Sequence, residues 1–140
     1  MAAATENRNT LELACGSMNI HRVFTVKATK TIYAGTLVAV DSSGYALPAA
    51  DASGLVVVGI AQHYAEAGEK ITVKSGVFSL DNSAAPNACS NSLTMNNLVF
   101  VADDHTVTTS AGSHSVKAGV MRYVDDEGSV WAEIGNIRTT

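Results

Sequence analysis

Hydrophobic and polar positions alternate over much of the chain with the period of a β-strand. In "HRVFTVKAT" (21–29), Val23 and Thr25 fall on one side and Phe24 and Val26 fall on the other. A period of two is typical of strands, whereas helices repeat every ~3.6 residues. Comparable segments between Asp, Ser and Gly turns predict strands at residues 21–28, 37–40, 45–47, 55–61, 70–80, 98–109 (with an acidic turn inside), 117–124 and 129–135.

Proline and glycine mark places where these strands are interrupted. Pro48 has no N–H to donate and is expected to end the pairing of its strand. Gly59 predicts a bulge or a close backbone approach, and Gly76 lies inside the predicted strand 70–80. The best helical candidates are short turns near residues 49–53 and 88–95. The pattern therefore predicts an all-β fold, a small barrel or a β-tulip-like sandwich.

Two parts of the chain repeat one pattern. "TLVAVDSSGYALPA" and "NLVFVADDHTVTTS" both read polar-Leu-Val-x-Val, then an acid, a turn and a short return strand. Further along, Tyr64 to Gly76 spans 12 positions, and so does Tyr123 to Gly135. An isolated hairpin is marginally stable, so two such units are expected to pack on one core. The sequence predicts two pseudo-repeated hairpin units, at about residues 36–76 and 97–135.

The first residues differ from the rest of the chain. "MAAATENRNT" is polar without periodicity, and "LELACGSMNI" is only loosely apolar. Chain ends of this kind are ordered only where something holds them. We therefore divide the chain into an extended N-terminal arm at residues 1–20, expected to be loose, and a β domain at residues 21–140.

The composition fits a single domain that carries few charges. The chain has 140 residues, 16% of them charged, and a formal net charge of −4. The acidic balance and the scattered lysines argue against nucleic-acid binding, which requires a basic stripe. The longest apolar run, residues 55–61, is too short to span a bilayer, and residues 1–10 do not resemble a signal peptide. Cys15 and Cys89 predict reduced thiols in a protein made in the cytoplasm.

Candidate catalytic and metal-binding groups are sparse. No short metal-ligand spacing joins the four histidines, which are His21, His63, His105 and His114. The acid pairs Asp103–Asp104 and Asp125–Asp126 fall in predicted turns, where Asp accepts hydrogen bonds from nearby backbone N–H groups. Trp131 lies on a predicted strand and is interpreted as a core residue. The sequence therefore predicts no catalytic residue, no cofactor and no metal site.

Four stretches carry a resemblance to a known family. They are "AGTLVAVDSSGYALPAADASGLVVVGIAQ", "VKSGVFSL", "NLVFVADDHTVT" and "KAGVMRYVDDEGSVWAEI", within about Val23 to Ile134. The Gly-x-Leu-Val opening, the "DSSGYA" turn, the "GIA" strand, the Gly-Val-Phe strand and the closing Gly-Val-Trp-like strand are the shared features. In these features the chain resembles the capsid cement, or head decoration, proteins of tailed phages and prophages.

The resemblance implies a structural protein that forms a homotrimer on the outside of the expanded phage head. There it would clamp neighbouring major capsid protein subunits against DNA pressure, after synthesis in the host cytoplasm. The resemblance implies no enzyme activity, no cofactor, and no contact with nucleic acid or membrane. We expect the N-terminal arm to contact the capsid through Asn7, Arg8, Leu11, Leu13, Met18 and Ile20.

Two other functions stay open on the residues alone. A carbohydrate- or host-surface-binding β module of a virion would present an exposed aromatic side chain, for which Trp131 is the candidate. A small hydrolase, or a Ca²⁺ site, would use the carboxylates of the turns at residues 103–104 and 125–126.

Overall fold

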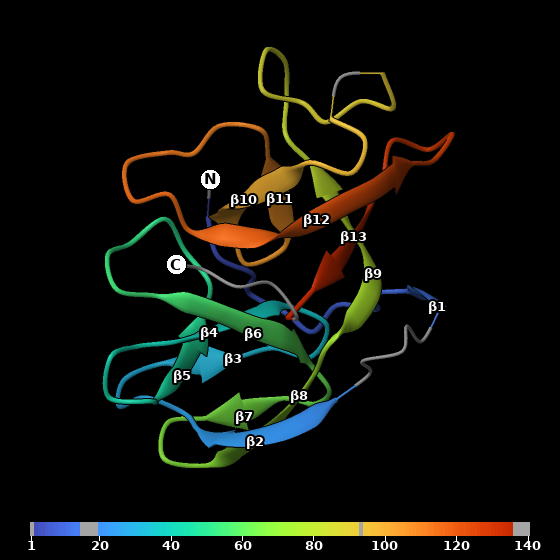
Figure 1. The fold of residues 1–140 in the computed structure, drawn as a ribbon. Coiled ribbons are helices and arrows are strands. Elements are labelled where there is room, and N and C mark those ends of the chain that lie inside the picture. The colour runs from blue at the N-terminus through green and yellow to red at the C-terminus, as the bar shows by residue number, and fades with distance from the viewer. Residues whose placement is uncertain (1, 15–19, 93, 136–140) are drawn as a thin grey trace.

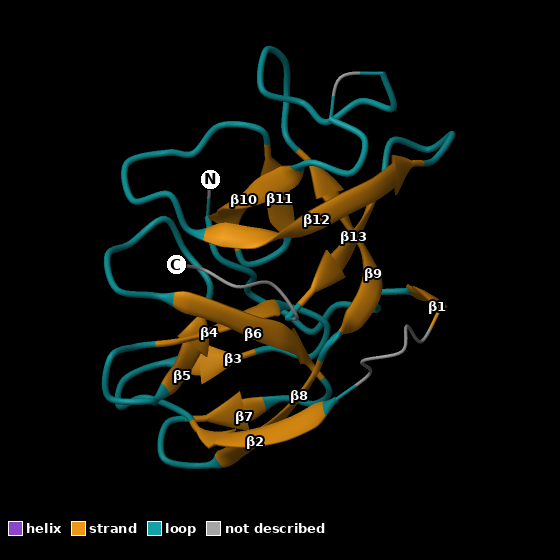
Figure 2. Ribbon diagram, in the orientation of Figure 1, coloured by secondary structure: helices purple, strands orange, loops and turns teal. Residues whose placement is uncertain are grey.

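The computed structural model of the chain is built from short strands joined by turns (Figure 1, Figure 2). It describes residues 2–14, 20–92 and 94–135, and these segments contain no helix, so none that could cross a membrane. The all-β prediction is confirmed. The strands are β1 (Glu12–Ala14), β2 (His21–Thr25), β3 (Thr31–Ile32), β4 (Leu37–Val40), β5 (Ala46–Pro48), β6 (Val56–Ala61), β7 (Ala65–Glu66), β8 (Lys70–Lys74), β9 (Gly76–Asn82), β10 (Leu98–Asp103), β11 (Thr106–Thr108), β12 (Lys117–Val124) and β13 (Val130–Ile134).

Strands β9 to β13 form a closed five-stranded barrel, which we call the second unit. Its order is β9–β13–β12–β10–β11, with antiparallel neighbours throughout. The barrel closes where β11 returns to β9 as a parallel neighbour, with Thr106 opposite Asp81 and Val107 opposite Asn82. Closure pairs backbone groups that the edges of an open sheet would leave exposed.

Strands β2, β4, β5, β6 and β8 form the first unit, a five-stranded sheet of order β2–β8–β6–β4–β5. Its two ends approach each other at an isolated parallel bridge between Val26 and Ala46. Strand for strand, this is the order of the second unit, so the prediction of two similar units is confirmed, although the repeated arrangement also includes β2 and β9 and the predicted bounds at 36–76 and 97–135 stay a prediction. The boundary between arm and domain at residue 20 stays a prediction.

The two units share one hydrophobic core. Its buried side chains include Phe78, Val99 and Met121 from the second unit, and Leu37 and Ile60 from the first. A smaller cluster inside the first unit consists of Val26, Ile32, Val38, Ala46, Val58, Ala61, Ala65, Ile71 and Val73.

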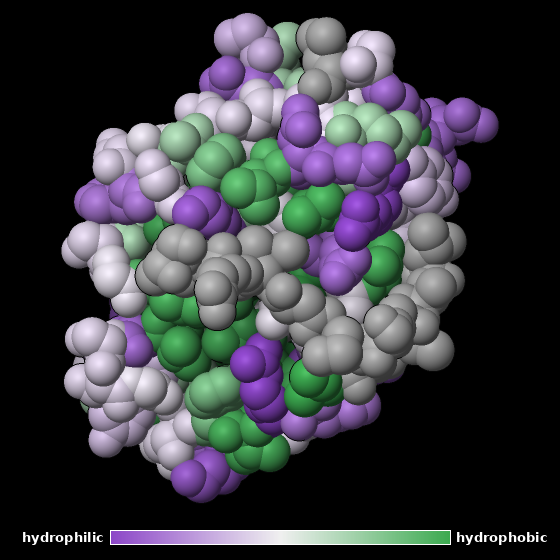
Figure 3. Space-filling model, viewed as in Figure 1, coloured by the Kyte–Doolittle hydropathy of each residue, from purple (hydrophilic) through white to green (hydrophobic). Residues whose placement is uncertain are grey.

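Strands β4 and β6 supply side chains to both clusters, because one face points into the first unit and the other toward the second. This burial on two faces explains why "LVAV" and "VVVGIA" are continuously apolar instead of alternating. On the face seen in Figure 3, hydrophobic residues gather over β6, beside the junction of the two units.

Two glycines occupy equivalent bulges in the two units. The register of β4 against β6 shifts beside Gly59, and the register of β10 against β12 shifts beside Gly119. A β-carbon at Gly59 would lie 2.6 Å from the carbonyl oxygen of Lys74, and one at Gly119 would lie 1.9 Å from that of Glu133. The bulge and close approach predicted at Gly59 are confirmed, and they recur at Gly119.

The prediction of a single strand at residues 70–80 is wrong. β8 ends at Lys74 and β9 begins at Gly76, and the two strands belong to different units. Gly76 has a φ of 155°, a backbone conformation that side chains rarely adopt. The chain passes from one unit to the other at Ser75–Gly76, and the buried apolar positions change phase there, from Ile71 and Val73 to Phe78 and Leu80.

The helical turns expected near residues 49–53 and 88–95 do not develop into helices. In the first, Ala52 N donates to the carbonyl oxygen of Ala50 at 2.9 Å, which is a tighter turn than a helix. In the second, where residue 93 is not described, a bond of helical span joins Thr94 N to the carbonyl oxygen of Ser90 at 3.2 Å. One such bond does not offset the entropy of nucleating a helix.

Candidate functional site

The N-terminal arm lies against both units, although the sequence predicted a loose segment. Arg8 N donates to the carbonyl oxygen of Ala34 at 2.6 Å, and Ala34 N donates to Asn7 Oδ1 at 2.9 Å. Ala34 lies between β3 and β4, next to the first unit. β1 then pairs antiparallel with β9 of the second unit, with Glu12 opposite Phe78. Residues 4–14 of the arm are therefore held by the domain, while the extent of the arm to residue 20 stays a prediction.

Glycine at position 35 permits this close docking. A β-carbon there would lie 2.0 Å from the carbonyl oxygen of Arg8, and the φ of Gly35 is 81°. The hydroxyl of Thr10 donates to the carbonyl oxygen of Gly35. The arm and the segment before β4 therefore meet backbone to backbone, with no room for a side chain.

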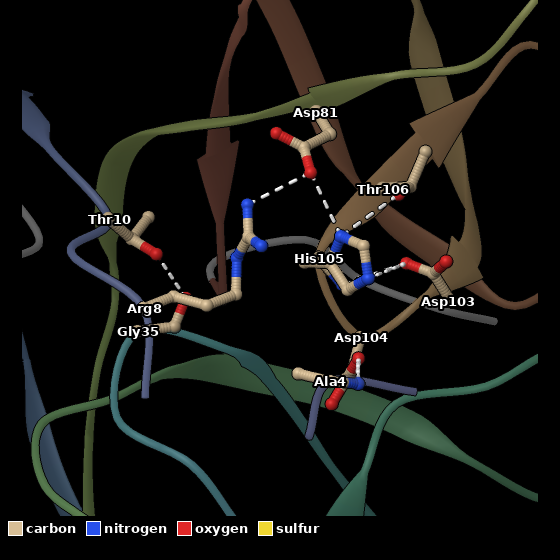
Figure 4. Close-up of polar contacts among 9 residues, drawn as sticks. All are labelled: Ala4, Arg8, Thr10, Gly35, Asp81, Asp103, Asp104, His105 and Thr106. Carbon is tan, nitrogen blue, oxygen red and sulfur yellow. Dashed lines mark hydrogen bonds and ion pairs between the residues drawn. The ribbon is translucent and has the colours of Figure 1, made fainter. Parts of the chain in front are cut away.

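An ionic network ties the arm to the β10–β11 turn (Figure 4). Arg8 Nη2 lies 2.9 Å from Asp81 Oδ2, and the same oxygen lies 2.9 Å from His105 Nδ1. On the far side of the imidazole ring, His105 Nε2 lies 3.5 Å from Asp103 Oδ1. The network joins the arm, β9 and the β10–β11 turn, which are far apart in the sequence.

Asp104 provides a second anchor for the arm. It is 1% exposed, and its Oδ1 accepts a hydrogen bond from Ala4 N at 2.7 Å. Its Oδ2 has no hydrogen-bond partner among the described residues. Burial raises the pKa of Asp104, because the carboxylate loses its hydration.

Asp103, Asp104 and His105 each offer a ligand atom that a divalent cation accepts, and these atoms lie within 4.8 Å of one another. Their bonds to the protein account for this arrangement. Asp103 Oδ1 accepts a hydrogen bond from His105 N at 3.0 Å, which is the turn chemistry that the sequence predicted. Ligand-spacing rules do not detect such a cluster, because here a tight turn brings three consecutive side chains together.

The acidic turn between β12 and β13 is also built from backbone hydrogen bonds. Asp125 Oδ1 accepts from the N–H groups of Glu127 at 3.0 Å and Ser129 at 2.9 Å. Asp125 Oδ2 accepts from Trp131 Nε1 at 3.0 Å, and this bond is the main cause that lowers the pKa of Asp125. Trp131 is 9% exposed and stacks on Tyr123, with ring centroids 6.0 Å apart. Its assignment to the core is confirmed, so its indole is not available as a sugar platform.

The class of the protein follows from its sequence family. A family model described as phage cement protein matches residues 17–134. The chain belongs to the phage cement protein family. The resemblance found in the sequence is thereby confirmed, and the chain is a capsid cement protein located on the virion. No curated protein and no solved structure matches it.

The arm residues predicted to contact the capsid differ in how exposed they are in this cement protein. Leu11 is 55% exposed and Ile20 is 41% exposed, so both present apolar surface. Leu13 lies in β1, and Met18 lies outside the described residues. Arg8 is half-buried in the ionic network described above. Whether these residues touch the capsid stays a prediction.

Cys89 takes no part in the arm network that the described residues form. Cys89 is a free, buried thiol, and burial raises its pKa. A raised pKa keeps the thiol protonated and therefore weakly nucleophilic. Cys15 lies outside the described residues.

Proposed function

We propose that this cement protein binds the outside of the expanded head as a homotrimer and clamps neighbouring major capsid protein subunits against the pressure of the packaged DNA. The observation that carries the proposal is the family match over residues 17–134. In this proposal the protein is made in the host cytoplasm and joins the head as it matures. It acts as a structural component and not as an enzyme.

The packing of the fold supports a mechanical role. The shared core lets side chains of one unit transmit a load to the other, because protein interiors are close-packed and resist compression. Asp103 and Asp104 of one turn, and Asp125 of the other, are engaged with backbone N–H groups, and Asp125 also accepts from the indole of Trp131. Each contact can be weak, because the three subunits of a trimer bind together and their linked contacts raise the overall affinity.

The N-terminal arm supplies capsid contacts in this proposal. Leu11 and Ile20 offer exposed apolar side chains next to strands of the domain. Asn7 and Arg8 also bond to the domain, so in this proposal their part of the arm is already in place when it meets the capsid. Pre-ordering lowers the entropy that binding must offset.

Two measurements test the proposal. Light scattering of the purified protein is expected to give the mass of a trimer. Sedimentation with purified heads that lack this protein is expected to bring it down with expanded heads and to leave it in solution with procapsids. Equal binding to procapsids would contradict the preference for the expanded lattice, and failure to bind either particle would contradict the function.

A further inference from the structure

The two units differ at one strand edge. In the second unit, β9 carries β1 along one edge, and Ser79 N donates to the carbonyl oxygen of Leu11 at 2.7 Å. In the first unit, β2 pairs with β8 along one edge. No strand of the described residues pairs with the opposite edge between His21 and Thr25. β2 is therefore open where β9 carries an added strand.

The strand order shows that these two edges are equivalent. Val26, directly after β2, forms a bridge to Ala46 of β5. In the same way, Asn82 of β9 pairs with Val107 of β11. Val23 precedes Val26 by as many positions as Ser79 precedes Asn82, so Val23 is the counterpart of Ser79. An edge that accepts a strand in the second unit is thus present in the first, where no strand among residues 2–14, 20–92 and 94–135 pairs with it.

The backbone groups of Val23 point toward the open edge. Val26 N donates to Glu69 O, next to β8, whereas Lys27 N donates to Ala46 O on the opposite side. Successive residues of a strand direct their N–H and C=O groups to opposite neighbours, so Val23 faces the same way as Lys27. The amide of Val23 is in place to bond to an added strand, as the amide of its counterpart bonds to the arm.

Apolar side chains lie along this edge. Val23 is 61% exposed, the highest value among the large hydrophobic residues described. At the end of β2, Thr25 and Val26 line a groove of 760 Å³, which Tyr45 also lines with 48% of its surface exposed. An unpaired strand edge beside apolar surface is a template for a second polypeptide.

The face also carries positive charge. Lys70 on β8 lies opposite Thr25, and Lys74 lies opposite His21. Lys74 Nζ lies 2.9 Å from Glu12 Oε1 of the arm, whereas Lys70 Nζ donates to a neutral group, the hydroxyl of Thr25, at 2.7 Å and forms no ion pair within the described part of the chain. An acidic side chain on an added strand would complement Lys70, as Glu12 complements Lys74.

We propose that the open edge of β2 accepts an extended segment of the major capsid protein, which adds to the sheet as a further strand and brings an acidic side chain toward Lys70. This inference rests on the proposed function, because family membership supplies the capsid as partner. A second copy of this chain is a poorer occupant, since β1, its own strand of this type, is already paired with β9. Strand addition gives affinity through main-chain hydrogen bonds and specificity through alternate side chains.

Two substitutions at one position separate the backbone from the side chain. Val23→Pro removes the outward N–H and leaves the ladder to β8 intact, whereas Val23→Thr keeps that N–H and the β-branched shape. In sedimentation with expanded heads, we expect V23P to bind about tenfold or more weakly, and V23T to stay within about threefold of the unsubstituted protein.

The outcomes distinguish the inference from the proposed function. If the unsubstituted protein binds heads and a folded V23P binds equally well, the inference is overturned and the function stands. If the unsubstituted protein does not bind, the function itself is overturned. If V23P lowers the oligomeric mass in light scattering, the edge binds a second copy, and the inference is again overturned.

Hydrogen exchange of the unsubstituted protein decides the question should V23P not fold. The amide of Val23 is expected to exchange about tenfold or more slowly on heads than in solution. The amide of Phe24 faces β8 and serves as the control, with little change expected. An equal exchange rate at Val23 in both states would overturn the inference.

Discussion

The first and second units share one strand order, yet they are completed to different extents. In the second unit a two-residue parallel ladder closes the barrel, and β1 covers the remaining edge of β9. In the first unit a single bridge joins the ends of the sheet, and the edge of β2 stays open. One strand order thus occurs in two forms, one with the β9 edge paired and one with a β2 edge that no described strand pairs.

The two hydrophobic clusters also differ in which units contribute to them. The larger cluster draws on both units, whereas the smaller cluster is confined to the first unit and its small β3–β7 sheet. β4 and β6 link them by contributing to both. We therefore expect the two units to unfold in one cooperative transition, although each has its own strands.

Truncation of the smaller core is the largest expected effect and tests whether the units unfold together. Ile71 is fully buried in the first unit, so Ile71→Ala is expected to cost about 4 kcal/mol of unfolding free energy, and the control Ile71→Val about 1 kcal/mol. Urea unfolding followed by Trp131 fluorescence reports on the second unit, and circular dichroism reports on the whole fold. In I71A, the urea midpoints from fluorescence and from circular dichroism should decrease together. If the fluorescence midpoint of I71A equals that of the unsubstituted protein, the two units unfold independently.

The second-largest loss of stability is expected when a side chain is added at the bulge of the second unit. Gly119→Ala would place a β-carbon against the carbonyl oxygen of Glu133, with an expected cost of about 3 kcal/mol. Gly44→Ala is the control, since nothing lies within 4 Å of its β-carbon and only its φ of 84° is unfavourable, at about 1 kcal/mol. Equal losses in urea unfolding would mean that β12 shifts away from β13 at little cost.

Removing residues 1–14 would give β9 an open edge like that of β2. The deletion removes the β1 pairing and leaves Asp104 without the N–H of Ala4, so we expect a loss of about 2 kcal/mol and a lower Tm. Arg8→Gln removes only an exposed ion pair and is expected to change stability by about 0.5 kcal/mol or less. An unchanged Tm after deletion would restore the loose arm that the sequence predicted.

The β4–β5 and β10–β11 turns hold aspartates with opposite pKa shifts. The hydrogen bond from Lys27 is the main cause that lowers the pKa of Asp41 below 3.8, and burial raises the pKa of Asp104 above 3.8. Asp41 therefore stabilises the fold above pH 3.8, and this contribution is lost as the pH falls through its lowered pKa. The contribution of Asp104 is fully present below pH 3.8 and is lost as the pH rises through its raised pKa.

Replacing each aspartate by asparagine should therefore change the unfolding free energy in opposite directions at about pH 7. These are the smallest effects among the substitutions proposed here. Asp41→Asn is expected to be slightly less stable than the unsubstituted protein, and Asp104→Asn slightly more stable, because it removes a buried charge. Urea midpoints at about pH 7 and about pH 3 measure both, and the two differences should shrink at the lower pH. A loss of stability for D104N at about pH 7 would show that the charged carboxylate is needed there.

Local pattern was sufficient for most strands and for the turn chemistry of Asp103 and Asp125. The prediction failed at residues 70–80, because it did not use the change of phase at Ser75–Gly76, where the chain passes between the two units. It also missed the docking of the arm, because Arg8 meets Asp81 and Ala4 meets Asp104 across long stretches of sequence. Contacts of this kind leave no periodic signal in either partner.

Alternation, turn residues and spacing were enough for the all-β class, the paired hairpin pattern and the bulge at Gly59, because these are local properties of the chain. The family rests on a resemblance, confirmed by the match over residues 17–134. The closure of one unit into a barrel, the pairing of β1 with β9, and the β2 edge that no described strand pairs depend on contacts between distant segments. Equivalent strands with the same local pattern reach different environments, since what covers an edge depends on which distant segment folds against it.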